Sequence, residues 1–212
     1  MNYMRTIFLI LLLASVNIFA QPKEYIVTNK GDTIAGSVTI LPKQIVVSRT
    51  PGDTVILNSE DVRHYVKNET ANPVLRLILY GYSDNIEEVQ TYNYRNPVYD
   101  TTILLKPLIA GEKLNLFTAK DKRKVVYFFV QWAGDSKVEQ LLYSVGGELR
   151  DKASWGHPYQ WVNYVTHHLI FIDQLNEMTK ECEAITVGHL RMLEYRESNL
   201  KSFVKRYNKN CK

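Results

Sequence analysis

The segment Val-Val-Tyr-Phe-Phe-Val at residues 125–130 constrains the fold of this chain more than any other part of the sequence. Successive side chains of an extended strand point to opposite faces of its sheet, and here both alternating sets are apolar. The run is far too short to cross a bilayer as a helix, which takes about 20 apolar residues. It therefore predicts a strand inside a sheet, with the C-terminal helical segment covering one face and another part of a curled sheet covering the other.

The composition is that of an ordinary globular protein. Of the 212 residues, 45% are hydrophobic and 23% are charged, with 10 Gly and 7 Pro, which excludes disordered, collagenous and polytopic membrane proteins. The formal net charge of +4 is mild for this length and lacks the dense basic stripe of nucleic-acid-binding proteins. We therefore expect one main domain and no nucleic-acid partner.

Residues 1–20 carry the features of a secretory signal peptide. Arg5 precedes an apolar run from Ile7 to Ala14, and the small residue Ala20 marks the cleavage point. A membrane anchor is the rival interpretation, but Ser15 interrupts the apolar run too early for a span. The sequence predicts an exported protein of the periplasm, cell envelope or extracellular space, with no transmembrane segment after signal cleavage.

A region from residue 21 to about 152 has the pattern of antiparallel strands. Apolar residues alternate with polar ones, and many are β-branched or aromatic. Asn29–Asp32 and Pro51–Asp53 are turn sequences between such runs, because glycine tolerates a positive φ. We expect about ten antiparallel strands in a curled or barrel-like sheet, with Ser59 capping a single helical turn between two of them.

Residues 153–212 are predicted to form a helical C-terminal segment packed on the β domain. From about Pro158 the apolar residues step by three or four, as in Trp161, Val165 and Leu169, which is typical of amphipathic helices. Gly188 is the expected break, and Ser198 is the expected cap of the last helix. The predicted class is therefore α+β, with two or three helices after the strands.

Aromatic residues at the junction between strands and helices are the candidate binding site. Flat rings beside amide side chains suit recognition of a sugar or a peptide. The alternative is that Trp155 and Trp161 only join the helices to the sheet. The candidate ligand-binding residues are Tyr92, Tyr94, Trp155, His157 and Tyr159, with Tyr99 following the upstream pair.

No sequence motif indicates catalysis, a metal or a cofactor. The chain has no C-x-x-C, H-E-x-x-H, G-x-S-x-G, Walker or G-x-G-x-x-G sequence. His167 and His168 would point about 100° apart on a helix and so would not close on one ion. We predict no catalytic residues, no metal ligands and no cofactor.

Charged clusters are expected to be solvated surface. Glu60–Asp61 and Glu87–Glu88 are acidic pairs, but glycoside hydrolysis needs two carboxylates across a cleft, which sequence neighbours do not demonstrate. Lys120–Lys124 is expected to be an exposed hairpin tip, with a phosphate or membrane contact as the alternative.

Three segments of the chain resemble a group of uncharacterised secreted proteins of Bacteroidetes. They are the opening Tyr25–Gly36, the later Gly111–Phe117 and the closing Leu200–Cys211. No activity is attached to that group. The resemblance implies that its paired terminal cysteines correspond to Cys182 and Cys211.

Export and an even cysteine count also permit a disulfide between Cys182 and Cys211. Two long unbroken helices would hold the cysteines on the order of 30 Å apart, too far for a bond. A break near Thr179, followed by a turn and an antiparallel return, would bring them together. We favour the second arrangement and predict the disulfide.

Asp-Thr pairs occur three times, as Asp32–Thr33, Asp53–Thr54 and Asp100–Thr101, and are expected in turns at strand starts. They also resemble the acceptor sequences of O-glycosylation in Bacteroidetes, so Thr33, Thr54 and Thr101 are candidate modification sites.

The favoured function is a non-catalytic module that binds an envelope protein, a peptide or a glycan, or that has a structural role. The alternative is a hydrolase whose site is assembled across the fold. A concave site with converging histidines and carboxylates would favour the hydrolase, whereas an exposed aromatic patch or a usable sheet edge would favour the module.

Overall fold

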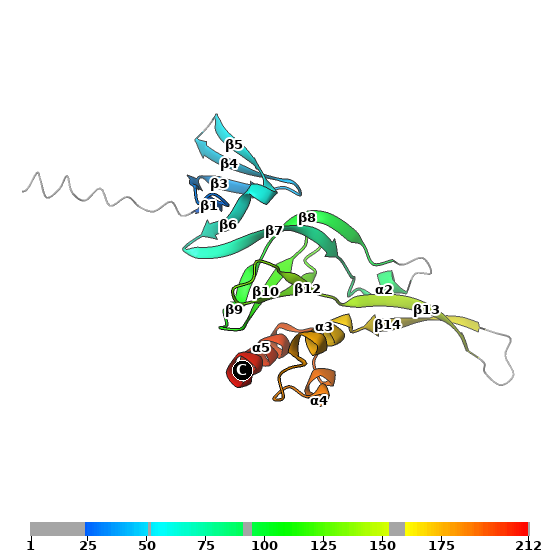
Figure 1. Cartoon of the computed structure of the whole chain (residues 1–212). Coiled ribbons are helices and arrows are strands. Elements are labelled where there is room, and N and C mark those ends of the chain that lie inside the picture. Colours follow the sequence, from blue (N-terminus) through cyan, green and yellow to red (C-terminus); the bar gives the residue numbers. More distant parts are fainter. Residues whose placement is uncertain (1–23, 51, 91–94, 153–159, 212) are drawn as a thin grey trace, which may run out of the picture.

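Figure 1 shows the computed structural model, which describes residues 24–50, 52–90, 95–152 and 160–211. Side chains are described at these positions except 147–152 and 160–164. The predicted signal peptide, residues 1–20, lies outside the described residues.

The described residues form fourteen strands in four open sheets, in which every paired neighbour is antiparallel. The largest sheet has the order β2-β1-β6-β7-β8, and a three-stranded sheet has the order β3-β4-β5. The bounds of these strands are β1 Glu24–Thr28, β2 Thr33–Ala35, β3 Ser37–Ile40, β4 Gln44–Thr50, β5 Asp53–Asn58, β6 Val62–Lys67, β7 Thr70–Tyr80 and β8 Val98–Leu104.

The remaining strands form a four-stranded sheet, β12-β11-β10-β9, and a two-stranded ribbon of β13 and β14. Their bounds are β9 Lys106–Ile109, β10 Leu114–Lys120, β11 Val126–Trp132, β12 Glu139–Leu141, β13 Ser144–Lys152 and β14 Gln160–His168. The helices are η1 Ser59–Asp61, α2 Ile86–Val89, α3 Ile170–Thr179, α4 Val187–Arg191 and α5 Glu197–Asn210.

The predicted α+β class, with antiparallel strands followed by C-terminal helices, is confirmed. The strands are more numerous than the predicted ten, and their sheets are open. One cause of the larger number of strands is Gly36, whose φ of +154° turns the chain and separates β2 from β3. A Cβ at Gly36 would lie 2.6 Å from the carbonyl oxygen of Ser48, so glycine is needed where this bend passes β4.

The prediction of a helix beginning near Pro158 is wrong for residues 160–168, which form strand β14. This strand pairs with β13 over nine residues, from Gln160 opposite Lys152 to His168 opposite Ser144. A spacing of four residues fits one face of a helix, but it also fits one face of a strand, because four is an even number. The β-branched and aromatic residues of this segment favour the strand, and α3 begins only at Ile170.

Strand β11 is covered on both faces, as predicted. Phe128 and Val130 pack in one core cluster with Phe171 of α3 and Phe203 of α5. Tyr127 and Phe129 pack in a second cluster with residues of β7 and β8, including Leu79 and Ile103. Figure 1 shows the resulting layers, with the β7–β8 ribbon on one side of the β9–β12 sheet and the helices on the other.

Strand β7 joins the N-terminal strands to these layers. Its first residues, Thr70–Pro73, pair with β6, and its later residues, from Val74 on, pair with β8. At its end, the side-chain amide of Gln140 in β12 bonds both main-chain groups of Tyr80, at 3.0 and 2.7 Å. The N-terminal strands pack around their own cluster, which includes Ile26, Ile45 and Val47.

The C-terminal helices turn back as the disulfide prediction required. Helix α3 ends at Thr179, and α5 returns so that Cys182 and Cys211 are bonded, with 5.2 Å between their Cα atoms. The prediction of Ser198 as a cap is wrong, because α5 begins at Glu197 and has no side-chain cap. The single turn η1 is confirmed, but Ser59 is its first residue and not its cap.

A side-chain amide fastens α5 to the start of β10. The Oδ1 atom of Asn208 accepts the main-chain N–H groups of Lys113 and Leu114, at 2.9 and 3.0 Å. Its Nδ2 group donates to the carbonyl of Leu114 at 2.8 Å. A Cβ at Gly111 would collide with the amide of Asn208, so a larger residue there would displace this amide.

We expect the Cys182→Ser/Cys211→Ser double variant to lose about 3 to 4 kcal/mol of unfolding free energy, because the bond closes a loop with a separation of 29 residues. Urea unfolding without reductant measures the difference. The wild-type protein with reductant is the matched control and should show the same loss. An unchanged unfolding midpoint in both cases would contradict the role of the bond.

Candidate functional site

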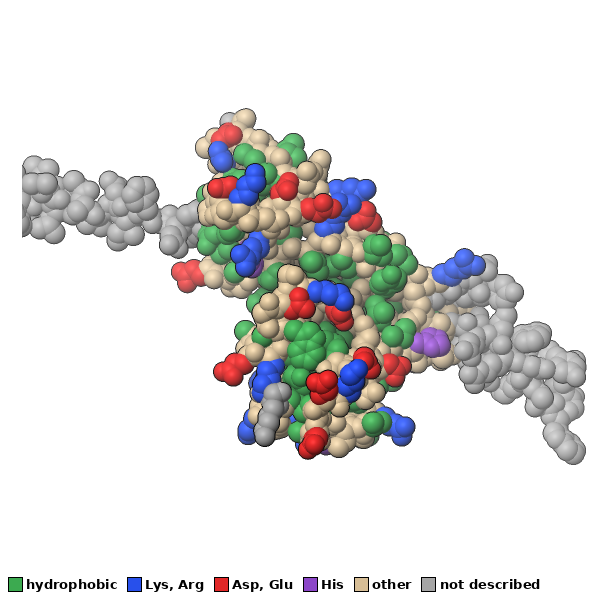
Figure 2. Space-filling view, viewed as in Figure 1, with side chains coloured by type: hydrophobic (Ala, Val, Ile, Leu, Met, Phe, Trp, Pro, Cys, Tyr) green, Lys and Arg blue, Asp and Glu red, His purple; other side chains and the backbone are tan. Residues whose placement is uncertain are grey.

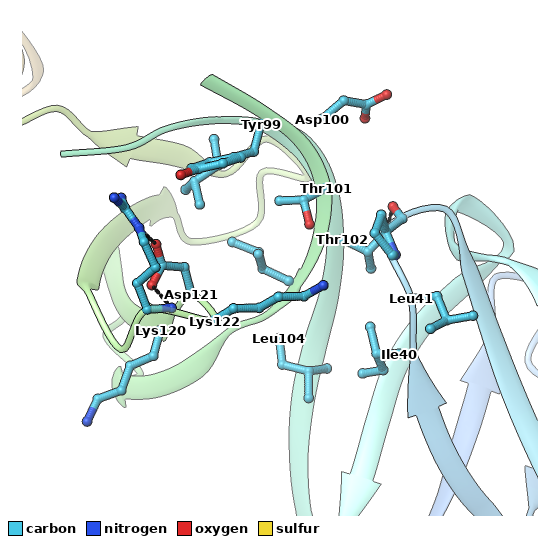
Figure 3. Close-up of a pocket in the computed structure, with 14 residues that line it drawn as sticks. Ile40, Leu41, Tyr99, Asp100, Thr101, Thr102, Leu104, Lys120, Asp121 and Lys122 are labelled. Carbon is cyan, nitrogen blue, oxygen red and sulfur yellow. Dashed lines mark hydrogen bonds and ion pairs between the residues drawn. The ribbon is translucent and has the colours of Figure 1, made fainter. Parts of the chain in front are cut away.

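A pocket of about 590 Å³ lies where three separate segments of the chain meet. Strand β8 runs through its centre, the turn between β3 and β4 borders it, and the tip of the β10–β11 hairpin faces that strand (Figure 3). These segments contribute residues 40–42, 99–104 and 120–123, with Leu79 of β7 completing the lining. The pocket is therefore built from parts of the sequence that lie up to about 80 residues apart.

Most of the surface that lines this pocket is apolar. Ile40 and Leu41 lie on one side of β8, whereas the ring of Tyr99 lies on the other, near the hairpin tip (Figure 3). The hydroxyl of Thr101 also projects on the Tyr99 side. Such a lining suits a ligand with an apolar or flat body and a few polar groups.

One carboxylate organises the hairpin tip. Asp121 accepts the main-chain N–H groups of Arg123 and Val125, at 2.8 and 3.0 Å, and the hydroxyl of Tyr127 at 3.0 Å. Burial and this nearby carboxylate raise the pKa of Tyr127, so its hydroxyl remains a proton donor. Lys124 adopts a left-handed φ of 69°, which the tight turn requires. The tip is therefore held by internal bonds.

Arg123 continues this network toward Tyr99. Its guanidinium donates to the carbonyl of Tyr82 at 3.1 Å and forms ion pairs with Asp121 and Glu88. The guanidinium carbon lies 5.9 Å from the centre of the Tyr99 ring. Arg123 is thus engaged by its neighbours and supports one side of the pocket.

Two lysines of the lining, Lys120 and Lys122, have no ion pair in the described part of the chain, and Lys122 is the one directed at β8. It is exposed, and its side chain extends from the hairpin tip toward β8, whereas Lys120 points away (Figure 3). The other carboxylate of the lining, Asp100, is held by Arg76 at 3.2 Å, and these hydrogen bonds lower the pKa of Asp100. Both lining carboxylates therefore have partners, which leaves the ammonium of Lys122 available to an acidic ligand.

The structure brings one of the predicted aromatic residues into this pocket, Tyr99. The candidate ligand-binding residues Tyr92, Tyr94, Trp155, His157 and Tyr159 lie outside the described residues. Trp161 belongs to β14, and its side chain is not described.

The three Asp-Thr sequences differ in their positions. Thr33 and Thr54 are exposed at the starts of β2 and β5, as expected. Thr101 lies in the middle of β8 and is half-buried, so the prediction of a turn at Asp100–Thr101 is wrong. The reason is that β8 begins earlier, at Val98, and pairs with β7 throughout.

The histidines of the described residues lie on three different elements. His64 is on β6, His189 is on α4, and His167 and His168 end strand β14, where both are exposed. The expected helical placement of the last two is therefore wrong. Burial and the charge of Arg63 lower the pKa of His64.

The acidic pairs take part in surface contacts. Glu60 pairs with Arg76, and Glu88 pairs with Arg123. Within the described ranges, no three His, Cys, Asp or Glu side chains lie close enough to hold a metal ion.

Comparisons with known proteins give no relative on which to base an assignment. No protein-family model matches the chain, and neither the curated proteins nor the solved structures contain a match. In the part of the chain that the structure describes, no helix combines the length and the apolar character that a membrane span requires.

Sequence reasoning did not find this pocket as a unit. The cluster Lys120–Lys124 was correctly predicted as an exposed hairpin tip, but its position beside β8 depends on how two hairpins pack. Ile40 and Leu41 carry no motif. The signals in the sequence were the basic cluster and Tyr99, about 20 residues apart.

We expect Asp121→Asn to lower the unfolding free energy by about 1 to 3 kcal/mol, because an amide nitrogen cannot accept the bonds that this carboxylate receives. Asp135→Asn is the matched control, since Asp135 accepts the N–H of Lys137 in an exposed turn after β11. Urea unfolding gives both values. Equal losses for the two variants would contradict the special role of Asp121 at the tip.

Proposed function

We propose that this chain is an exported, non-catalytic binding module of the cell envelope or extracellular space. Its ligand is a protein, peptide or glycan that presents an acidic group to the pocket beside β8. The observation that carries the proposal is the ammonium of Lys122, which extends across an apolar pocket whose lining carboxylates already have partners. A cation in such a place gains most from an anionic ligand.

Two further observations support the compartment. Residues 1–20 have the charge and apolar pattern of a signal peptide. The Cys182–Cys211 bond suits an oxidising compartment, in which disulfides form and persist. We also propose that the chain belongs to the secreted Bacteroidetes group that three of its segments resemble.

The aromatic residues Tyr92, Tyr94, Trp155, His157 and Tyr159 remain proposed ligand contacts on the strength of their sequence pattern. Thr33 and Thr54 remain proposed sites of O-glycosylation, and their exposure at strand starts supports this. For Thr101, modification would place a sugar inside the pocket, so we favour Thr101 as a pocket residue.

The probe for this proposal is 1-anilinonaphthalene-8-sulfonate, which joins a sulfonate to flat apolar rings and fluoresces when its rings leave water. We expect saturable binding to the wild-type protein. Lys122→Gln should weaken binding about fivefold, because an exposed charge pair contributes up to roughly 1 kcal/mol. Lys122→Glu should weaken it further, because it places a negative charge opposite the sulfonate.

Lys124→Gln is the matched control, since Lys124 lies on the same hairpin tip, is exposed and does not line the pocket. This variant should bind the probe as the wild-type protein does. Equal affinities of Lys122→Glu, Lys124→Gln and wild-type protein would contradict the proposed site.

A further inference from the structure

Strand β8 is the edge of its sheet, and its open side lies in the pocket. In the described part of the chain it pairs with β7 alone. Every residue from Tyr99 to Leu104 lines the pocket. Since alternate side chains of a strand point to opposite faces, an unbroken run of lining residues means that the pocket follows the edge of the strand.

Two hydrogen bonds establish which main-chain groups of β8 are on the open side. The N–H of Gly81 donates to the carbonyl of Pro97 at 2.7 Å, and the N–H of Leu105 donates to the carbonyl of Pro73 at 2.9 Å. In an antiparallel pair, every second residue bonds to the partner strand. Tyr99, Thr101 and Ile103 therefore bond to β7, and the residues between them face the other way.

The main-chain N–H and C=O groups of Asp100, Thr102 and Leu104 thus face the open edge. The opposite strand supports this alternation, because the main-chain groups of Tyr80, opposite Val98, turn away from β8 and bond to Gln140. The open edge offers donors and acceptors at every second residue, over about 17 Å for six residues. A second extended main chain matches this repeat.

The walls of the pocket suit such a strand. Leu41 on one side and Tyr99 on the other offer apolar contacts, and Lys122 offers a positive charge. Edge strands are commonly protected from pairing by charged residues, Pro, a bulge or a covering loop. Residues 99–104 contain neither Lys nor Pro, the β7–β8 register is regular, and the charge of Asp100 is paired with Arg76. The turn at residues 40–42 contacts the strand through its side chains, since the hydroxyl of Thr102 donates to the carbonyl of Pro42 at 2.8 Å.

We infer that β8 binds an extended peptide segment by strand addition, with an acidic residue of that segment paired with Lys122. This inference rests on the proposed function and names its ligand as a peptide. Main-chain bonds to the edge provide affinity, and the charge of Lys122 selects an acidic sequence. The exposed apolar side chains on the outer face of this ribbon, Ile78, Tyr80 and Val98, extend the surface that a larger partner would meet.

Figure 2 shows hydrophobic side chains gathered over the middle of the molecule, with acidic and basic side chains around them. This face of the molecule therefore combines apolar area with a charged border, as protein interfaces do.

The test uses the peptide acetyl-Val-Thr-Val-Glu-Val-Thr-Val-amide and the uniformly ¹⁵N-labelled protein. Two further versions carry N-methyl groups, one on the first, third, fifth and seventh residues and the other on the second, fourth and sixth. Because alternate N–H groups of a strand face opposite sides, one version should lose at least tenfold in affinity and the other should bind as the parent does. Lys122→Glu should weaken the parent peptide, and Lys124→Gln should not.

Amide exchange supplies a second readout. Binding of the parent peptide should slow exchange at Asp100, Thr102 and Leu104, while Thr101 and Ile103 should already be protected in the free protein. Strand addition would be overturned if the two methylated versions bound with equal affinity. It would also be overturned if the peptide did not bind while binding of the sulfonate probe still depended on Lys122. In both cases the proposed pocket would stand. If neither the peptide nor the sulfonate probe binds more weakly to Lys122→Glu than to the wild-type protein, the proposed function itself is overturned.

Discussion

The burial of β11 on both faces is the constraint on which the rest of the structure depends. A strand whose consecutive side chains Tyr127, Phe128, Phe129 and Val130 are all buried must have a layer on each side. Each such side chain contributes about 1.5 to 3 kcal/mol when it leaves water. The β7–β8 ribbon and the C-terminal helices supply the two layers, and Tyr195 packs against both core clusters. Its hydroxyl accepts the N–H of Phe128 and donates to the carbonyl of Leu141, which attaches it to the middle sheet.

The same arrangement creates the candidate site. The β10–β11 hairpin extends from the core to its tip, where Asp121 accepts main-chain N–H groups of the turn. The side chain of Lys122 extends from this tip toward β8 (Figure 3). Strand β8 is held from its inner face by the core beneath it, while its outer edge stays open. The pocket therefore combines a rigid base with unpaired main-chain groups, which is the combination that recognition by strand addition uses.

The parts predictable from the sequence were those with local signals. The apolar sets of 125–130 predicted a doubly covered strand. The signal peptide and the even cysteine count favoured a disulfide, and with it the break near Thr179 that lets Cys182 meet Cys211. Strand β14 was missed because Trp161, Val165 and Leu169 fit one face of a helix and one face of a strand equally well. The pocket was beyond prediction, because the approach of residues 40–42 and 120–123 to β8 depends on sheet packing that no local spacing records.

Native-state hydrogen exchange, read amide by amide by NMR, tests the central claim about β11 most directly. If β11 is the covered centre of the molecule, the amides of Phe129 and Val130 should be among the slowest and should exchange only through global unfolding. Amides of β4 in the smaller N-terminal sheet should exchange through openings of lower free energy. Protection of β4 that exceeds the protection of β11 would contradict the account.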